Sequence, residues 1–230
     1  MPVHSIHIII IICVGFITIH STMVSRKGKR FFMSYLGETF MKCYYRAVFT
    51  VVSAILMFGV YYLISILPDS TFYSVSSWLK WPMHAIQLGG MFFGMGSLLV
   101  LDAGEFFGIK QVRRCRKAQN PDLTSLSIDG LSPFKLRTTG VYSIIRHPIY
   151  FAGVCMITFQ PTLSYNWFVV MIMADIYFIY AAFKEERILL RVIPEEYSAY
   201  KQKIPMFNIF KGIYNKITTQ EMDVSERTLS

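Results

Sequence analysis

An apolar run from residue 149 to residue 183 constrains this chain more than any other feature. Its only Asp, Glu, Lys or Arg side chain is Asp175, and the polar segment 161–166 interrupts it near the middle. The run is too long for one membrane span of about 20 residues and nearly long enough for two. We therefore expect a helical hairpin that enters a bilayer near His147 and returns to the same surface at residues 184–186.

The two ends of this hairpin carry polar side chains that the hairpin would bring together. His147-Pro148 suits a helix start, because proline is tolerated in a first turn, where its missing N–H costs nothing. A helix N-terminus beside Arg146 favours an anionic group such as a carboxylate. On the returning helix, Glu185 or Glu186 could accept hydrogen bonds or face a cation. We expect any chemistry of this chain at these hairpin ends.

The composition extends the membrane interpretation to the whole chain. Of its 230 residues, 53% are hydrophobic and only 16% are charged, which is typical of a polytopic membrane protein. A cleaved signal peptide is the rival interpretation of the first apolar stretch, but no basic segment precedes it. We expect an all-α fold, one membrane domain over residues 1–230 with five transmembrane helices and a cytosolic pocket. The expected spans are residues 5–22, 47–67, 83–103, 148–164 and 166–184, and residues 185–230 form the tail.

The positions of the basic residues predict an orientation. Six Lys or Arg lie in residues 23–46, eight in 104–146 and eight from residue 184 onward, against one in 68–82. By the positive-inside rule the basic segments are cytoplasmic, with the N-terminus outside, and the cell membrane is the expected location. Orientation and contact with anionic membrane lipids account for the net charge of +9, so we expect no nucleic-acid partner. The oligomeric state stays open.

The remaining reactive side chains form no recognisable ligand set. The cysteines have no C-x-x-C spacing and are expected to be small buried apolar groups, although Cys115, in a basic stretch, could be a reactive thiol. They are Cys13, Cys43, Cys115 and Cys155. The histidines lack the spacing of a metal site, so no metal is expected. Asp175, in mid-span, is either functional or paired with a polar group between helices.

Motifs at the hairpin ends resemble those of a known family. The chain reads G-V-Y-x-x-x-R-H-P-x-Y-x-x-G over residues 140–153, E-E-x-x-L over 185–189, and E-E-Y-x-x-Y-x-x-x-I-P over 195–205. This order resembles the integral-membrane methyltransferases, which include isoprenylcysteine carboxyl methyltransferase and the phospholipid methyltransferases. Within them it most resembles the branch holding methanethiol S-methyltransferase and accessory proteins of nitrite and nitric oxide reduction. The resemblance implies S-adenosyl-L-methionine as cofactor.

The resemblance also assigns residues. It implies cofactor contacts at Gln111, Phe134, Lys135, Leu136, Arg137, Tyr142, His147, Pro148, Ile149, Tyr150 and Glu185. We expect Arg146, His147 and Glu185 to act at the reacting centre. The alternatives are that His147 only caps a helix and that Arg146 only anchors at headgroups. Glu186 is expected to be a structural partner of Lys184 or Arg187.

One departure from the family bears on the acceptor. The isoprenylcysteine enzymes carry a substrate-binding arginine four residues before the cofactor glutamate, and here that position is Ala181. A small thiol or a lipophilic acceptor therefore fits better than a prenylcysteine carboxylate, and no general base is identified. The alternatives are an isoprenylcysteine carboxyl or phospholipid N-methyltransferase, an NADPH-dependent membrane reductase resembling the sterol reductases, and an accessory membrane protein without turnover.

Overall fold

The structure, a computed structural model, describes residues 3–117 and 136–218, and most of these residues are helical. This confirms the expectation of a mainly helical protein. The chain groups into two compact units, which are described separately. The first comprises Met1–Val75, Leu101–Phe134 and Thr162–Ala174, and the second comprises Ser76–Val100, Lys135–Pro161 and Asp175–Ser230.

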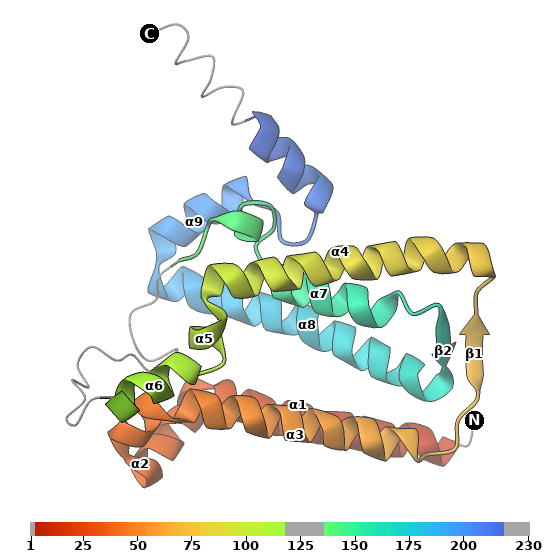
Figure 1. The fold of residues 1–230 in the computed structure, drawn as a ribbon, viewed down its shortest axis with the longest axis horizontal. Coiled ribbons are helices and arrows are strands. Elements are labelled where there is room, and N and C mark those ends of the chain that lie inside the picture. The colour runs from red at the N-terminus through yellow and green to blue at the C-terminus, as the bar shows by residue number, and fades with distance from the viewer. Residues whose placement is uncertain (1–2, 118–135, 219–230) are drawn as a thin grey trace, which may run out of the picture. The chain divides into compact units, whose positions relative to one another are not determined.

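Three helices begin the first unit: α1 (Val3–Val24), α2 (Arg26–Cys43) and α3 (Tyr45–Ser65). Helices α1 and α3 lie side by side, as Figure 1 shows, around a core of Ile9, Cys13 and Ile64. Ser25 separates α1 from α2 because its hydroxyl accepts a hydrogen bond from the Gly28 amide at 3.0 Å, which caps the new helix. The first apolar helix therefore ends at Val24, and the polar and basic α2 begins after Ser25.

Two short helices, α5 (Ala103–Phe106) and α6 (Ile109–Lys117), complete the basic end of this unit. A disulfide joins Cys43, the last residue of α2, to Cys115 of α6. The expectation of small buried apolar groups, or of a reactive thiol at Cys115, is wrong for this pair, because residues 72 positions apart meet only in the tertiary structure. Cys13 and Cys155 are free and buried, as expected.

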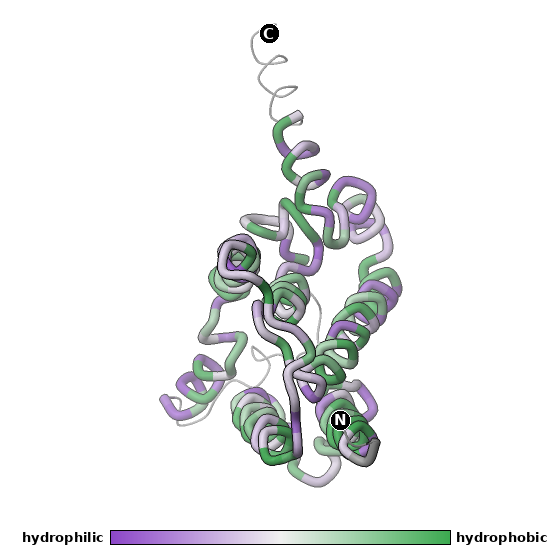
Figure 2. Tube along the Cα trace, turned by 90° about the vertical axis from the view of Figure 1, so that its right-hand side faces the viewer, coloured by the Kyte–Doolittle hydropathy of each residue, from purple (hydrophilic) through white to green (hydrophobic). Residues whose placement is uncertain are grey.

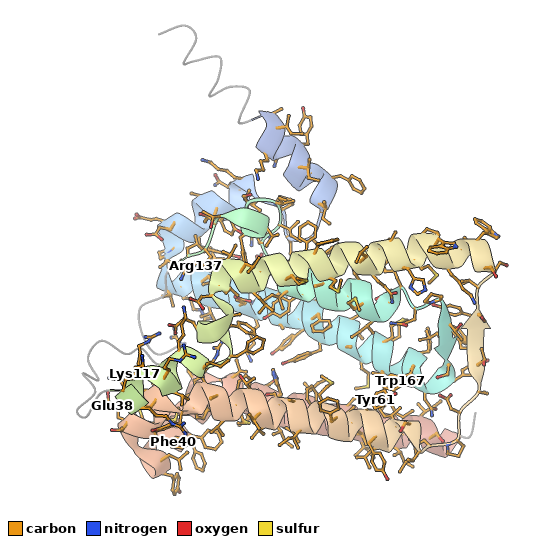
Figure 3. The ribbon with its side chains drawn as sticks, viewed as in Figure 1. Glu38, Phe40, Tyr61, Lys117, Arg137 and Trp167 are labelled. Carbon is orange, nitrogen blue, oxygen red and sulfur yellow. A yellow bond between two sulfur atoms is a disulfide. The ribbon has the colours of Figure 1, made fainter. Side chains whose placement is uncertain are left out.

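The opposite end of the first unit holds a small sheet that the sequence did not predict. Strand β1 (Thr71–Ser74) pairs antiparallel with β2 (Thr162–Ser164), and the two lie together in Figure 1. The Asp69 carboxylate accepts a hydrogen bond from the Asn166 amide at 3.1 Å, and Tyr61 faces Trp167 with ring centroids 5.4 Å apart (Figure 3). Two strands this short carry too little sequence pattern to be recognised without their partner.

The second unit contains the elements that carry the hairpin motifs. They are α4 (Ser77–Leu101), the 3-10 helix η1 (Gly140–Ser143), α7 (Pro148–Thr158), the later part of α8 (Tyr165–Val192), α9 (Pro194–Lys203) and a last helix over residues 209–218. Small residues allow close approach: a Cβ at Gly90 would lie 2.5 Å from the Cys155 Cβ, and one at Gly153 would lie 2.7 Å from the Phe178 ring.

Within residues 3–117 and 136–218, four helices are long and apolar enough to cross a membrane: Ser5–Val24, Tyr45–Ser65, Ser77–Leu101 and Tyr165–Val192. Figure 2 shows α1 and α3 as largely hydrophobic tubes. The other predicted span, 148–164, is helical only over the 11 residues of α7. At 1.5 Å per residue α7 is about 16 Å long, roughly half of a hydrocarbon core of about 30 Å. The five-span count therefore stays a prediction.

Candidate functional site

The site begins where α7 begins. Pro148 occupies the first turn of α7 and His147 is the residue before it, as expected from a proline that needs no N–H partner there. The Arg146 amide donates to the Pro205 carbonyl at 3.0 Å, which fixes this turn against the chain after α9. The His147 side chain is only 4% exposed, so the imidazole lies inside the protein.

The carboxylate of Glu186, on α8, is the centre of a buried ion cluster. Its Oε1 accepts from Arg146 Nε at 2.8 Å and lies 3.3 Å from His147 Nε2. Lys201 Nζ of α9 lies 2.8 Å from its Oε2. The Glu186 side chain is 3% exposed, and a buried carboxylate is stable only when it is paired in this way. The hairpin therefore does bring residues 146–147 against residue 186, as the sequence predicted.

The partners of Glu186 differ from those expected. The sequence predicted Lys184 or Arg187, its neighbours on the same helix, but the structure pairs it with cations from two other elements. Arg146 also donates from Nη1 to the carbonyls of Lys201, at 3.1 Å, and of Ile204. Most of its N–H groups thus already donate to acceptors within the protein. We conclude that Arg146 joins α7, α8 and α9.

Glu185 differs from its neighbour in being accessible. Its side chain is 44% exposed, and its Oε2 lies 3.6 Å from His147 Nδ1. The His147 ring therefore lies between two carboxylates, one buried and one open. Burial lowers the pKa of His147, but the nearby Glu185 and Glu186 carboxylates outweigh it and raise the pKa above its ordinary value. A protonated imidazole can donate to both carboxylates, which fixes the Glu185 carboxylate beside it.

Aromatic side chains surround the imidazole. The Tyr150 ring, one turn into α7, stacks against His147 with centroids 5.6 Å apart, and Phe207 approaches at 6.1 Å. The Tyr200 hydroxyl donates to the Tyr142 carbonyl at 2.6 Å, which connects α9 to η1. Burial raises the pKa of Tyr142 to about 12, so this phenol stays protonated at neutral pH. The arrangement offers aromatic faces and one accessible carboxylate.

The other predicted cofactor residues of the second unit are less closely involved. Leu136 packs on the core formed by Leu189, Tyr197 and Tyr200. Arg137 is exposed and is labelled in Figure 3, while Ile149 is half-buried. Phe134 and Lys135 lie outside the described residues. Of the seven predicted cofactor residues in 136–150, four adjoin the ion cluster or its aromatic surroundings: Tyr142, His147, Pro148 and Tyr150.

Gln111, on α6, belongs to the first unit. Its Nε2 donates to the Glu105 carbonyl at 3.1 Å, while its Oε1 is buried and has no hydrogen-bond partner within residues 3–117 and 136–218. A buried acceptor without a partner is costly, so this atom suits a donor from a bound molecule. Among the described residues no His, Cys, Asp or Glu cluster could hold a metal ion.

The sequence missed two residues of the site, Tyr200 and Lys201. Both lie within the E-E-Y-x-x-Y-x-x-x-I-P motif over residues 195–205, and α9 begins at Pro194 with two acidic residues in its first turn. The motif indicated the resemblance but not which groups Tyr200 and Lys201 contact. Which partners α9 reaches depends on how it folds back from α8, and the spacing of its tyrosines does not encode that.

Comparisons with known proteins found two relatives with the same name. A methanethiol S-methyltransferase of Crocosphaera subtropica (strain ATCC 51142 / BH68) is 28% identical over 81 residues, which are 35% of this chain and 32% of that protein. A methanethiol S-methyltransferase of Pseudomonas sp. (strain GM41(2012)) is 22% identical over 187 residues, 81% of this chain and 66% of that protein. The resemblance to the membrane methyltransferases is confirmed. No family model and no solved structure matches.

The extent of these matches limits what passes to this chain. The matched segments cover about a third of one relative's length and just under two thirds of the other's. The resemblance therefore applies to a methyltransferase-like membrane chain, and cofactor, acceptor and orientation follow as proposals.

Proposed function

We propose that this chain transfers a methyl group from S-adenosyl-L-methionine to a small thiol or a lipophilic acceptor at a membrane. The observation that carries the proposal is the His147 imidazole held between the open Glu185 and the buried Glu186 at the start of α7. Two relatives named methanethiol S-methyltransferase support it. The motifs that predicted the chemistry are the ones that meet at this site.

The residues present fit the cofactor. S-adenosyl-L-methionine carries a cationic sulfonium and an ammonium group and supplies an electrophilic methyl carbon. Glu185 offers an accessible carboxylate for a cation, and the Tyr150 ring offers an aromatic face. Arg146 acts indirectly, because its guanidinium holds Glu186 and the carbonyls at the end of α9.

The chain's contribution to the reaction is mainly positioning. Methyl transfer needs donor and acceptor aligned about 3 to 3.5 Å apart, with water excluded, and the protein supplies that geometry. The position at which isoprenylcysteine enzymes carry a substrate arginine is Ala181, which favours an acceptor without a carboxylate. A thiol acceptor reacts as its thiolate, and its proton leaves to solvent.

We also propose one membrane domain with five spans in the plasma membrane, and with the basic segments on the cytosolic side. The disulfide between Cys43 and Cys115 lies among those basic segments, and disulfides persist mainly in oxidising compartments. The basic residues place this end in the cytosol, whereas the disulfide favours an oxidising compartment.

An introduced Ser70→Cys, in the loop beside β1, should react with a membrane-impermeant maleimide from outside the cell if the basic end is cytosolic. Labelling only after lysis would indicate the opposite orientation.

The deciding experiment is calorimetry on the detergent-purified chain with S-adenosyl-L-methionine and with its demethylated product. We expect binding by the wild type and by Glu195→Gln, an exposed carboxylate change on α9, and loss of binding in Glu185→Gln. Methanethiol is then supplied as acceptor, and methyl transfer would release dimethyl sulfide, which gas chromatography detects. Equal binding by Glu185→Gln and Glu195→Gln would refute the site, and no binding by the wild type would refute the function.

A further inference from the structure

The helix over residues 209–218, the last one coloured in Figure 1, exposes a stripe of large apolar side chains. Phe210 is 88% exposed, and Ile213, Tyr214 and Ile217 are 43%, 68% and 50% exposed. Their spacing of i, i+3, i+4 and i+7 places all four on one side of a helix. Within the part of the chain that the structure describes, no element covers this stripe.

The opposite side of the same helix is attached to the protein. Gly212, two positions after Phe210, is rotated from it by about 200° at 3.6 residues per turn. It is buried so tightly that a Cβ there would lie 1.9 Å from the Ile144 carbonyl oxygen. Asn215 Nδ2 donates to the Lys203 carbonyl at 2.8 Å. The helix therefore has one side fixed to the second unit and the other turned away from it.

Two exposed lysines flank the apolar stripe. Lys211 and Lys216 lie about 100° to one side and about 120° to the other side of Phe210 around the helix axis. A stripe of aromatic and aliphatic side chains bordered by lysines is the pattern of helices that lie in a membrane interface. Lysine stems cover apolar surface while their ammonium groups reach headgroup phosphates, and tyrosine favours the same depth.

We infer that helix 209–218 lies on the headgroup layer of an anionic membrane, with the stripe of Phe210, Ile213, Tyr214 and Ile217 inserted among the acyl chains. Charge complementarity selects this occupant, because both borders of the stripe are cationic. Another protein surface would not require a lysine on each border. The inference does not depend on the proposed function, since it concerns a surface and needs no cofactor.

The attachment at Gly212 connects this lipid-binding helix with the candidate site. Its contact is the backbone of Ile144, two residues before Arg146, whose guanidinium holds Glu186. Lipid binding by the stripe therefore fixes a helix that packs directly against the segment leading into His147.

The test places a spin label on the full-length chain in lipid nanodiscs. The label goes to Ile213→Cys on the stripe or to Glu195→Cys on α9, in a background in which the free cysteines Cys13 and Cys155 are replaced by serine. In nanodiscs with phosphatidylglycerol, we expect the residue-213 label to collide more with membrane-soluble oxygen than with an aqueous nickel chelate. The residue-195 label should show the reverse ratio.

A charge variant makes the test specific. Lys211→Gln with Lys216→Gln should move the residue-213 label toward water in phosphatidylglycerol nanodiscs, while the wild type in neutral phosphatidylcholine should already lie closer to water. All these positions are exposed, so the melting temperature should stay unchanged, which controls for folding. Aqueous collisions at residue 213 in both lipids would overturn the inference. Dipolar broadening between labels on two copies would also overturn it, in favour of a protein interface.

Discussion

The two units hold their functional segments in different ways. In the second, three side chains meet around the buried Glu186 carboxylate of α8: Arg146 and His147 from the turn before α7, and Lys201 from α9, with Arg146 and Lys201 within 2.8 Å. In the first, a disulfide between Cys43 and Cys115 joins α2 to α6, the helix that carries Gln111. The ion cluster therefore depends on pH and on each of its partners, whereas the disulfide depends on redox conditions.

The largest effect should come from Glu186→Ala. Removing the carboxylate leaves the Arg146 guanidinium, 8% exposed, buried without its counter-ion, and breaking such a pair costs about 3–5 kcal/mol. Unfolding in mixed detergent and sodium dodecyl sulfate measures it. The control is Glu185→Ala, whose side chain is 44% exposed and should cost much less. Equal losses for both variants would show that Glu186 is not the centre of the cluster.

The disulfide should rank next. Its loop of 72 residues predicts a stabilisation of about 3–4.7 kcal/mol from the lost freedom of the unfolded chain. Cys43→Ser with Cys115→Ser, or a reducing agent, should lower the melting temperature by the amount that corresponds to this free energy. Cys13→Ser, at a free thiol, is the control: it keeps the disulfide, so reducing agent should lower its melting temperature as it does for the wild type, whereas the double variant should not respond. A wild type whose melting temperature is the same with and without reductant would contradict the difference between the units.

A smaller effect should follow pH. Because Glu185 and Glu186 raise the folded-state pKa of His147, its stabilisation is complete below its unfolded pKa of about 6.5 and is lost as pH rises through the folded value. The melting temperature of the wild type should therefore fall more between neutral and alkaline pH than that of His147→Gln. Parallel pH profiles of the two proteins would show that protonation of His147 does not stabilise the cluster. The disulfide variant should keep the wild-type pH dependence.

The smallest effect belongs to a surface pair in the first unit. Lys42 lies 2.8 Å from Glu38 one turn earlier on α2, and the Glu38 side chain is 62% exposed. Such pairs contribute about 0.3–0.5 kcal/mol, so Glu38→Gln should change the free energy of unfolding by no more than that. The same unfolding titration measures it. A loss above about 1 kcal/mol would mean that short distance, rather than burial, sets the strength of ion pairs here.

The sequence anticipated the helices and the meeting of residues 146–147 with residues 185–186, for a clear reason. Apolar length sets the helices, and an apolar run broken at 161–166 has to fold back if both halves are to stay in lipid. The motifs at its ends then become neighbours. The polar clusters at the two ends were expected to be neighbours on this basis, and the structure places His147 Nδ1 3.6 Å from Glu185 Oε2.

Other features depended on contacts that sequence spacing does not encode. Glu186 was assigned the wrong partners because its own helix offers Lys184 and Arg187, whereas the fold of α9 brings Lys201. The β1–β2 pair and the disulfide likewise join segments 88 and 72 positions apart. No local periodicity marks such pairs before the chain folds.

By itself, then, the sequence determined a multi-span helical protein with methyltransferase-like motifs, because hydrophobic length and motif order are properties of the chain. Only the tertiary structure decided that Glu186 is the buried centre and Glu185 the open carboxylate. The two are adjacent and chemically identical, and burial against α7 and α9 is what separates them.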